Sequence, residues 1–438
     1  MAQIKPHTLS GFMELLPQPQ LQMEAIMEVL RRTYGLYGFT PLDTPAIEAA
    51  DVLLAKGGGE TEKQIYRFQK GDSDLALRFD LTVPLAKYVA LHYGELSFPF
   101  RRYQIGKVYR GERAQRGRFR EFYQADIDII GDGKLSITNE AEIPSIIYRT
   151  FSTLGLRRFQ IRVNNRKILN GFYAMLGLSE KAGDIMRTVD KLDKIGPDKV
   201  RTLLVDECGV EADKADEILR FIAIRGTNDE VLAALEQYRG KDGTFDLGLD
   251  ELSAVTKLLG AFGVPEENFA VDLTIARGLD YYTRTVFEVE APGAGVGSIG
   301  GGGRYDGLVE LEGGKPTPGV GFAVGFERAM LALEAFGGEM ADDVERCVYV
   351  ANAGAELRGE VFSLANLLRS AGIRTECDYQ GRSLKSQFKQ ADKVGAAYMV
   401  VIGGDELASG NVRLRDMGTG DEKLVARVEL VDELLGRL

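Results

Sequence analysis

The feature that most limits how this chain folds is the stretch 120–129, in which the character of the side chains alternates. Side chains of one parity are apolar or aromatic: Tyr123, Ala125, Ile127 and Ile129. Those of the other parity are mostly charged or amide-bearing: Arg120, Phe122, Gln124, Asp126 and Asp128. A period of two is typical of a β-strand with one face on a core. The opposite face is then either the floor of a polar pocket or a solvated antiparallel surface.

The loop before this strand is rich in arginine. Five arginines lie between positions 110 and 120, among glycines, and residues 103–130 are predicted to form two strands joined by this loop. The guanidinium fork suits phosphate oxygens, and glycine lets the backbone bend around a ligand. Such a loop alone is more often a solvated turn, but next to a polar strand face it is a candidate nucleotide site. The phosphate-binding pattern G-x-x-x-x-G-K-[ST] is missing, and the glycines at 300–303 lack the context of a dinucleotide site.

Composition argues against several kinds of catalytic site and indicates the cellular compartment. The chain has 438 residues, only two histidines (His7 and His92) and three well-separated cysteines. A histidine triad, a metal cluster and a disulfide framework are therefore not expected. The net charge of −11 argues against indiscriminate coating of nucleic acid, although local basic patches still allow a nucleic-acid substrate. With neither a membrane-length apolar stretch nor the apolar core of a signal peptide, the chain is expected in the cytoplasm.

Hydrophobic periodicity divides the chain into parts. Residues 1–165 and 263–336 carry mixed helix and strand signals and are expected to form a core in two pieces. Residues 166–262 are helical and charged, as in a helical insertion between them. After a charged, glycine-containing linker, strands and helices alternate over 344–438, which predicts a separate α/β domain with a mostly parallel sheet.

Shorter patterns predict individual elements. Residues 18–37 have near-helical apolar spacing, and the two prolines in 38–48 favour an edge or interface strand. A short strand at 75–79 should lead into a helix near Thr82. Strand signals return at 271–275 and 283–289, and 319–333 should run from strand into helix.

Three segments resemble, in order, the three motifs of class II aminoacyl-tRNA synthetases. The first is 38–45 (GFTPLDTP); the second comprises 108–110 (VYR), the loop that follows and 119–122 (FREF); the third is 321–328 (GFAVGFER). The resemblance implies an α+β catalytic domain with a mixed, mainly antiparallel sheet. It also implies a homodimer, because the first motif forms the dimer interface in that class.

Two further peptides resemble signatures of one family within this class. Residues 276–287 (ARGLDYYTRTVF) are similar to the signature peptide of the histidyl-tRNA synthetase family, and 301–307 (GGGRYDG) match its second signature. Residues 77–82 (LRFDLT) also match, in the form found in the eukaryotic-like branch. The resemblance covers nearly the whole chain, and 344–438 resembles the anticodon-binding domain of several class II enzymes. The implied activity is ATP-dependent activation of L-histidine followed by transfer to the 3′ end of its tRNA.

The resemblance implies an ATP site made of charged and aromatic groups. Arg110 should hold the α-phosphate and the histidine carboxylate, while Glu112 contacts the adenine and Phe122 stacks on it. Arg118 and Arg328 should hold the outer phosphates. Magnesium is implied through those phosphates, with no metal-binding residue expected.

The resemblance implies a histidine site beside it. The second catalytic cation, with Arg110, should be Arg277. The α-amino group should contact Asp80, Thr82 and Gln124. The imidazole should lie among Asp128, Tyr281, Tyr282 and Tyr305, because a carboxylate and phenol hydroxyls suit its two ring nitrogens.

The resemblance also implies contacts with tRNA. Arg113 and Gln115 match positions used near the acceptor end, although Ala114 stands where proline is frequent. Arg382, Lys385 and Lys389 either face the tRNA or belong to a solvated helix face. Two rival functions stay open: a non-catalytic regulatory subunit of ATP phosphoribosyltransferase, and a synthetase for another amino acid. The first typically lacks the anticodon domain and the signature arginine, whereas this chain has both.

Overall fold

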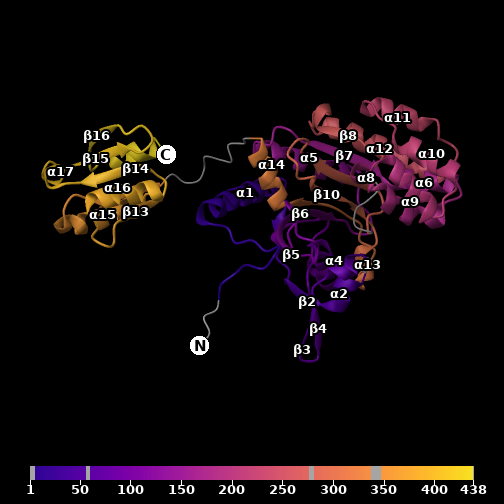
Figure 1. Ribbon diagram of the computed structural model, residues 1–438, viewed down its shortest axis with the longest axis horizontal. Coiled ribbons are helices and arrows are strands. Elements are labelled where there is room, and N and C mark those ends of the chain that lie inside the picture. Colours follow the sequence, from indigo (N-terminus) through magenta and orange to yellow (C-terminus); the bar gives the residue numbers. More distant parts are fainter. Residues whose placement is uncertain (1–4, 56–59, 276–280, 337–346, 438) are drawn as a thin grey trace. The chain divides into compact units, whose positions relative to one another are not determined.

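The computed structural model describes residues 5–55, 60–275, 281–336 and 347–437. They belong to two compact units, Met1–Met340 and Ala341–Leu438 (Figure 1). The first unit contains a large sheet, a small sheet and a helical insertion, whereas the second is a smaller sheet with its own helices.

An eight-stranded sheet forms the centre of the first unit. In spatial order its strands are β1 (Thr40–Pro41), β5 (Phe100–Tyr109), β6 (Glu121–Ile130), β11 (Gly319–Gly325), β10 (Ser298–Tyr305), β9 (Thr285–Glu290), β7 (Gln160–Asn165) and β8 (Phe269–Val271). The two outermost pairs are parallel, and every pair between them is antiparallel. The expected mixed, mainly antiparallel sheet is confirmed.

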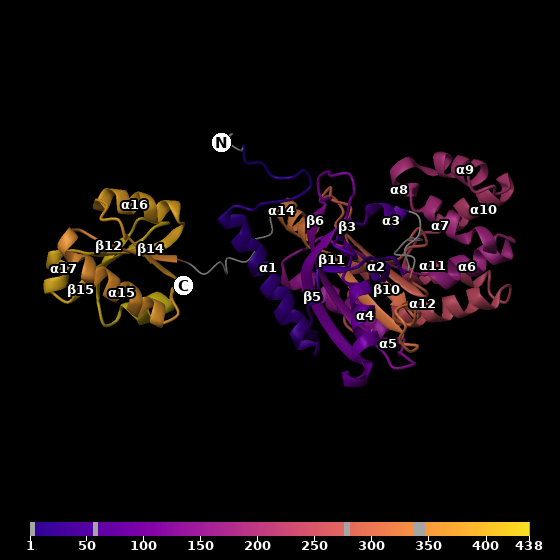
Figure 2. The same ribbon diagram turned by 90° about the horizontal axis from the view of Figure 1, so that it is seen from below.

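Helices cover one face of this sheet. They are α1 (Pro17–Leu36), α5 (Thr138–Thr153) and α14 (Phe326–Ala335), and Figure 2 shows α1 running beside β5 and β6. Ala125 and Ile127 of β6 are fully buried in one apolar cluster with Leu30 of α1 and Ile146 of α5. The apolar side chains of the alternating stretch therefore face the helices, as predicted. The polar side chains of the stretch lie on the other face of the sheet.

The helical insertion lies between β7 and β8. It contains α6 (Arg166–Met175), α7 (Ala182–Val189), α8 (Leu192–Ile195), α9 (Pro197–Asp206), α10 (Ala212–Ile222), α11 (Asn228–Glu236) and α12 (Gly243–Ala261), grouped beside β7 and β8 in Figure 1. Local signals explain the helix starts: Asp242 caps α12, and Thr227 with Glu230 forms a capping box at α11. Glycines let α6 and α12 approach closely, because a Cβ at Gly171 would stand 2.5 Å from the backbone nitrogen of Phe245.

A small three-stranded sheet, in the order β2-β4-β3, borders the main one. It is formed by β2 (Ile47–Ala49), β3 (Arg67–Lys70) and β4 (Ser73–Leu77), next to α2 (Ala50–Leu54), α3 (Glu60–Gln64) and α4 (Thr82–His92). The predicted strand and the helix near Thr82 are present. The single strand expected at 38–48 is instead two short pieces, because β1 joins the large sheet and β2 the small one.

The second unit is a five-stranded sheet flanked by helices, in the order β13-β12-β14-β15-β16. Its elements are β12 (Cys347–Asn352), α15 (Arg358–Ser370), β13 (Thr375–Cys377), α16 (Leu384–Lys393), β14 (Ala396–Ile402), α17 (Gly404–Ala408), β15 (Asn411–Asp416), β16 (Glu422–Ala426) and α18 (Leu430–Leu435). The alternation of strand and helix up to β14 is as predicted, and these three strands are parallel. The prediction of a mostly parallel sheet missed β15 and β16, which are antiparallel.

Candidate active site

A cavity of about 780 Å³ lies on the polar face of the eight-stranded sheet. Its walls come from the β5–β6 hairpin, β9, β10, β11, the start of α14 and the insertion around α8. The lining includes these predicted site residues: Asp80, Thr82, Arg110, Glu112, Gln115, Arg118, Phe122, Gln124, Asp128, Tyr281, Tyr282, Tyr305 and Arg328. Of the two interpretations of the alternating strand, the polar pocket is therefore confirmed.

The hairpin brings two cations, Arg110 and Arg118, to one end of the cavity. The Arg110 guanidinium lies 5.1 Å from the centre of the Phe122 ring, and its Nε donates to the carbonyl of Phe79 at 2.9 Å. The loop is closed by backbone hydrogen bonds between Gln115 and Arg118. A cation beside an aromatic plane is an arrangement that suits a purine base carrying phosphates.

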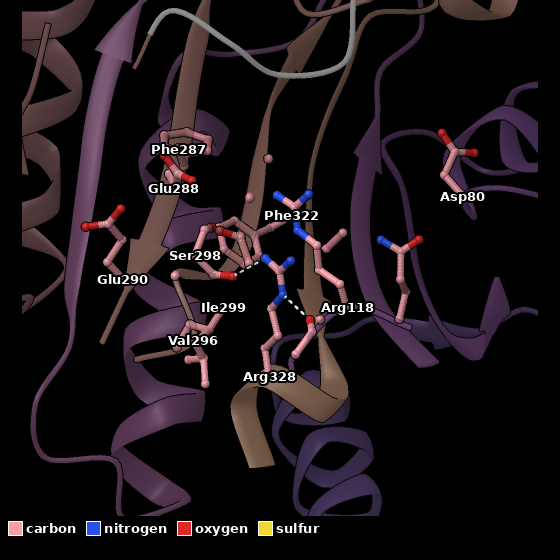
Figure 3. A pocket seen from close by; sticks show the side chains of 18 of the residues that line it. Asp80, Arg118, Phe287, Glu288, Glu290, Val296, Ser298, Ile299, Phe322 and Arg328 are labelled. Carbon is pink, nitrogen blue, oxygen red and sulfur yellow. Dashed lines mark hydrogen bonds between the residues drawn. The ribbon is translucent and has the colours of Figure 1, made fainter. Parts of the chain in front are cut away.

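Arg328, from the first turn of α14, adds a third cation to this end. Its Nε donates to the carbonyl of Gly117 at 2.6 Å and its Nη1 to that of Ser298 at 2.8 Å (Figure 3). Figure 3 shows Arg118 next to Arg328, with Asp80 across the cavity. Burial lowers the pKa of Arg328, and the Arg118 cation lowers it further. Arg328 is held by neutral carbonyls, and Arg118 pairs with the Glu112 carboxylate at 3.5 Å. Two neighbouring cations beside one carboxylate leave net positive charge, which favours an anionic ligand.

The other end of the cavity is acidic and more deeply buried. Asp80 is 2% exposed and accepts the backbone N–H groups of Thr82 and Val83 at 3.2 and 3.0 Å. Asp128 is also 2% exposed and accepts the Tyr305 hydroxyl at 2.5 Å. Burial raises the pKa of both carboxyl groups. Carboxylates in such a place favour a ligand that carries N–H groups or positive charge.

Three tyrosines line this acidic end. The Tyr281 ring lies 4.9 Å from that of Tyr282 and 5.7 Å from that of Tyr305, both edge-on. The Tyr281 hydroxyl donates to Asp80 at 3.4 Å. Burial raises the pKa of all three phenols, so they stay protonated donors at neutral pH. Donors and acceptors on one wall can hold a planar ring that is itself a donor and an acceptor.

Glycines on two strands keep the cavity open. A Cβ at Gly321 would overlap Oδ1 of Asp128, whereas at Gly301 it would meet only the carbonyl of Phe287, at 3.4 Å. Gly301 therefore borders open space, while Gly321 makes room for a carboxyl group. The glycine-dense run, which we did not predict as a strand, forms β10. Glycine is found at these positions because larger side chains would fill the cavity or clash with the neighbouring strands.

Some predicted residues lie elsewhere. Arg113 is exposed and is not part of the cavity wall. Arg277 lies outside the described residues. Lys385 and Lys389 are exposed on α16 of the second unit, and the backbone N–H of Arg382 donates to Asp378 at 2.7 Å.

Sequence reasoning missed several charged residues of the site. Arg102 is fully buried next to Asp128, with Nη2 2.8 Å from its Oδ2. Arg162 lines the cavity next to Glu290, at 2.6 Å. Asp126 was predicted to lie on the polar face of the strand but was given no role; it is 1% exposed and lines the cavity floor. The register of β5 and β6, which pairs Arg102 with Asp128, would have identified the first of these.

Neither a membrane span nor a metal cluster is found in the described part of the chain. No described helix is long and apolar enough to cross a membrane. The described residues also contain no group of three or more His, Cys, Asp or Glu side chains arranged to hold a metal ion.

Comparison with known proteins gives the family. The model of histidyl-tRNA synthetase matches residues 11–329, and that of the anticodon binding domain matches 347–437. A histidine–tRNA ligase of Clostridium tetani is 47% identical over 98% of both chains, and one of Finegoldia magna is 41% identical over 98% of this chain and all of its own. The crystal structure of histidyl-tRNA synthetase from Nostoc has a TM-score of 0.88 at 38% identity, with both chains covered completely. With its fold, its cavity and these relatives in agreement, the chain belongs to the histidyl-tRNA synthetase family.

Proposed function

We propose that this protein is a histidine–tRNA ligase that activates L-histidine with ATP and transfers it to the 3′ end of its tRNA. One observation carries the proposal: a single cavity has cations and an aromatic plane at one end, and buried carboxylates and phenols at the other. ATP fits the first end and histidine the second. Their reactive groups then meet between the two, near Arg110.

The first step is attack of the histidine carboxylate on the α-phosphorus of ATP, which releases pyrophosphate. In this step Arg110 stabilises the charge on the α-phosphate and orients the carboxylate, and Arg277 acts with it as the second catalytic cation. Arg118 and Arg328 hold the β- and γ-phosphates, Phe122 stacks on the adenine, and Glu112 contacts it. Preorganised cations accelerate such a displacement because they are already oriented when charge moves to the leaving group.

The histidine end supplies selectivity. Asp80, Thr82 and Gln124 bind the α-amino group; the buried Asp80 carboxyl gains a cationic partner when it does so. Asp128, Tyr282 and Tyr305 bind the imidazole, with Tyr281 holding Asp80. A site built to hydrogen-bond its substrate rejects analogues that lack those groups by about 10⁴-fold.

In the second step the 3′-hydroxyl of the tRNA attacks the adenylate. Arg113 and Gln115, both exposed on the hairpin loop, contact the acceptor end. Arg382, Lys385 and Lys389 contact tRNA from the anticodon-binding unit. Charge-reversing Lys385 and Lys389 to glutamate should weaken tRNA charging and leave ATP–pyrophosphate exchange unchanged.

We assign the parts as follows: 1–165 and 263–336 are the catalytic core, 166–262 is the insertion, and 344–438 binds the anticodon. Magnesium would enter with ATP, held through the outer phosphates, and would offset their negative charge during the displacement. The protein forms a homodimer through the segment around β1, next to which Leu36 and Ile47 are exposed. Its three free cysteines fit a reducing cytoplasm.

Histidine-dependent ATP–pyrophosphate exchange tests the activity. Exchange that requires L-histidine supports the proposal, and exchange with another amino acid redirects it. A folded sample with magnesium but no exchange supports the regulatory alternative. One solved structure, of an ATP phosphoribosyltransferase regulatory subunit/histidyl-tRNA synthetase from Bacillus halodurans, shares the fold at 22% identity and a TM-score of 0.73. The anticodon-binding match and Arg277 favour the ligase.

A further inference from the structure

Arg102 is a buried cation that the mechanism above does not use. It is fully buried on β5, in the strand pair with Asp128 of β6, and it does not line the cavity. We propose that Arg102 is a positioning residue of the histidine subsite, which keeps Asp128 in place as a charged acceptor for the imidazole N–H. This inference rests on the proposed function.

The first support is that one guanidinium joins two parts of the subsite. Its Nη2 lies 2.8 Å from Oδ2 of Asp128 and donates to the carbonyl of Leu81 at 3.0 Å. Leu81 lies between Asp80 and Thr82, which are assigned to the amino group of the substrate. Arg102 therefore fixes the distance between the imidazole end and the amine end of the pocket.

The second support is that the guanidinium is not otherwise satisfied. Its Nε and Nη1 are buried without a hydrogen-bond partner, as are Oδ1 of Asp126 and Oε1 of Gln124. An unpaired buried donor costs stability, and a leucine would avoid that cost. A cation kept in such a place is expected to serve its neighbours electrostatically.

The third support is the balance of charge around Asp128. The charged and titratable groups that interact with Asp128 are Arg102 from β5, Asp126 from β6, Tyr305 from β10 and Tyr282 before β9. Next to Asp126 lie two more, Arg110 after β5 and Asp80 before α4. Three of these seven groups, with Asp128 counted, are acids. Burial raises the pKa of Asp128, and the Arg102 charge opposes this rise. Arg102 also opposes the rise for Asp126 and Asp80.

The expected role follows from these charges. An ionised Asp128 accepts an imidazole N–H, while Tyr305 occupies its other oxygen. Without Arg102, burial would raise the pKa of Asp128 further, so a larger fraction of the carboxyl groups would hold a proton and accept more weakly. The loss should therefore be specific to histidine, and it should diminish as the pH rises.

The test is ATP–pyrophosphate exchange by the full chain carrying Arg102→Leu, measured from pH 7 to pH 9. We expect KM for histidine at pH 7 to rise at least about tenfold, as for loss of a charge-assisted hydrogen bond. The defect should shrink toward pH 9, and KM for ATP should stay within about twofold. Equal changes in both KM values, independent of pH, would show that Arg102 only supports the fold.

Arg101→Leu is the matched control. Arg101 is the preceding residue on the same strand, and it forms an ion pair with Glu142 at 2.6 Å. This pair lies away from the cavity, so its loss should change neither KM nor the pH profile. If the wild-type protein shows no histidine-dependent exchange, the proposed function is wrong. If the wild type is active and Arg102→Leu has the same KM values, only the role of Arg102 is wrong.

A double variant decides the question if Arg102→Leu does not fold. Arg102→Leu with Asp128→Asn removes both charges of the buried ion pair, so it should fold better than Arg102→Leu alone, which leaves Asp128 without its cation. Because the effect of Arg102 on the imidazole passes through Asp128, Arg102→Leu should raise KM for histidine much less in the Asp128→Asn background than the rise of about tenfold expected in the wild type. An equally large rise in the Asp128→Asn background would overturn the inference.

Discussion

The two ends of the cavity are built in different ways. At the phosphate end, Arg110 and Arg328 come from a hairpin and a helix start, and backbone carbonyls hold them in place. At the histidine end, Asp128 and Tyr305 come from strands and hold one another. The first end is half-exposed and cationic, and the second is buried and acidic. Separate anchoring lets one end be changed while the other keeps its geometry, so substitutions should separate ATP binding from histidine binding.

The largest effect is expected at the junction of the two ends. Arg110→Ala removes the cation that both substrates share, so kcat/KM for exchange should fall about 10³-fold. Lys107→Ala, on β5 just before Arg110, is the control, because Lys107 pairs with Glu121 at 2.8 Å and does not line the cavity. If both variants lost activity equally, the assignment of Arg110 to the reaction centre would be wrong.

The next effect should be confined to the histidine end. Asp128→Asn keeps the shape but removes the charge, so KM for histidine should rise about 10- to 100-fold while KM for ATP changes little. Thermal unfolding should also occur at a lower temperature, because the Arg102 cation loses its partner. Asp132→Asn, just past the end of β6, removes an exposed carboxylate and serves as control. An ATP KM that rose as much as the histidine KM would contradict the separation of the two ends.

A pair of glycines tests the same separation through packing. Gly321→Ala places a methyl group on Asp128 and should destabilise the fold by about 1–3 kcal/mol and weaken histidine binding. Gly301→Ala, on the neighbouring strand, points into open space and should change stability by less than about 0.5 kcal/mol. Denaturant unfolding and KM for histidine measure both effects. Similar losses of stability in both variants would mean that the strands, and not Asp128, limit the space.

The two ends also differ in how far the sequence predicts them. The hairpin arginines and Arg328 belong to contiguous peptides, so pattern and resemblance were enough to locate them. The alternation in β6 predicted which face is polar, since a period of two depends only on local geometry. Strand alternation also predicted the second unit up to β14.

What the sequence did not predict depends on pairing between distant segments. Arg102 became part of the site only through the register of β5 with β6. The glycines of β10 were not predicted as a strand, because glycine has low strand propensity and its neighbours supply the pairing. The antiparallel strands β15 and β16 were missed because the regular strand–helix alternation before them suggested a uniform parallel sheet.

The smallest effect is expected for Glu327, which precedes Arg328 in the wall of the cavity, and it should appear in the free energy of unfolding. This carboxyl accepts the backbone N–H of Tyr123 at 2.8 Å, and burial raises its pKa to about 7. Because the pKa is higher in the folded state than in the unfolded chain, the folded state binds more protons between about pH 4.5 and 7. The contribution of Glu327 to stability therefore falls as the pH rises through that range and stays low above it. Glu327→Gln should flatten this slope in denaturant unfolding at a series of pH values.

Glu312→Gln is the comparison. Burial also raises the pKa of Glu312 to about 7, but this carboxyl is less buried, so its effect should have the same sign and be smaller. A steeper slope in Glu327→Gln would mean that Glu327 is ionised in the folded protein at pH 5, and that it binds Tyr123 as a carboxylate.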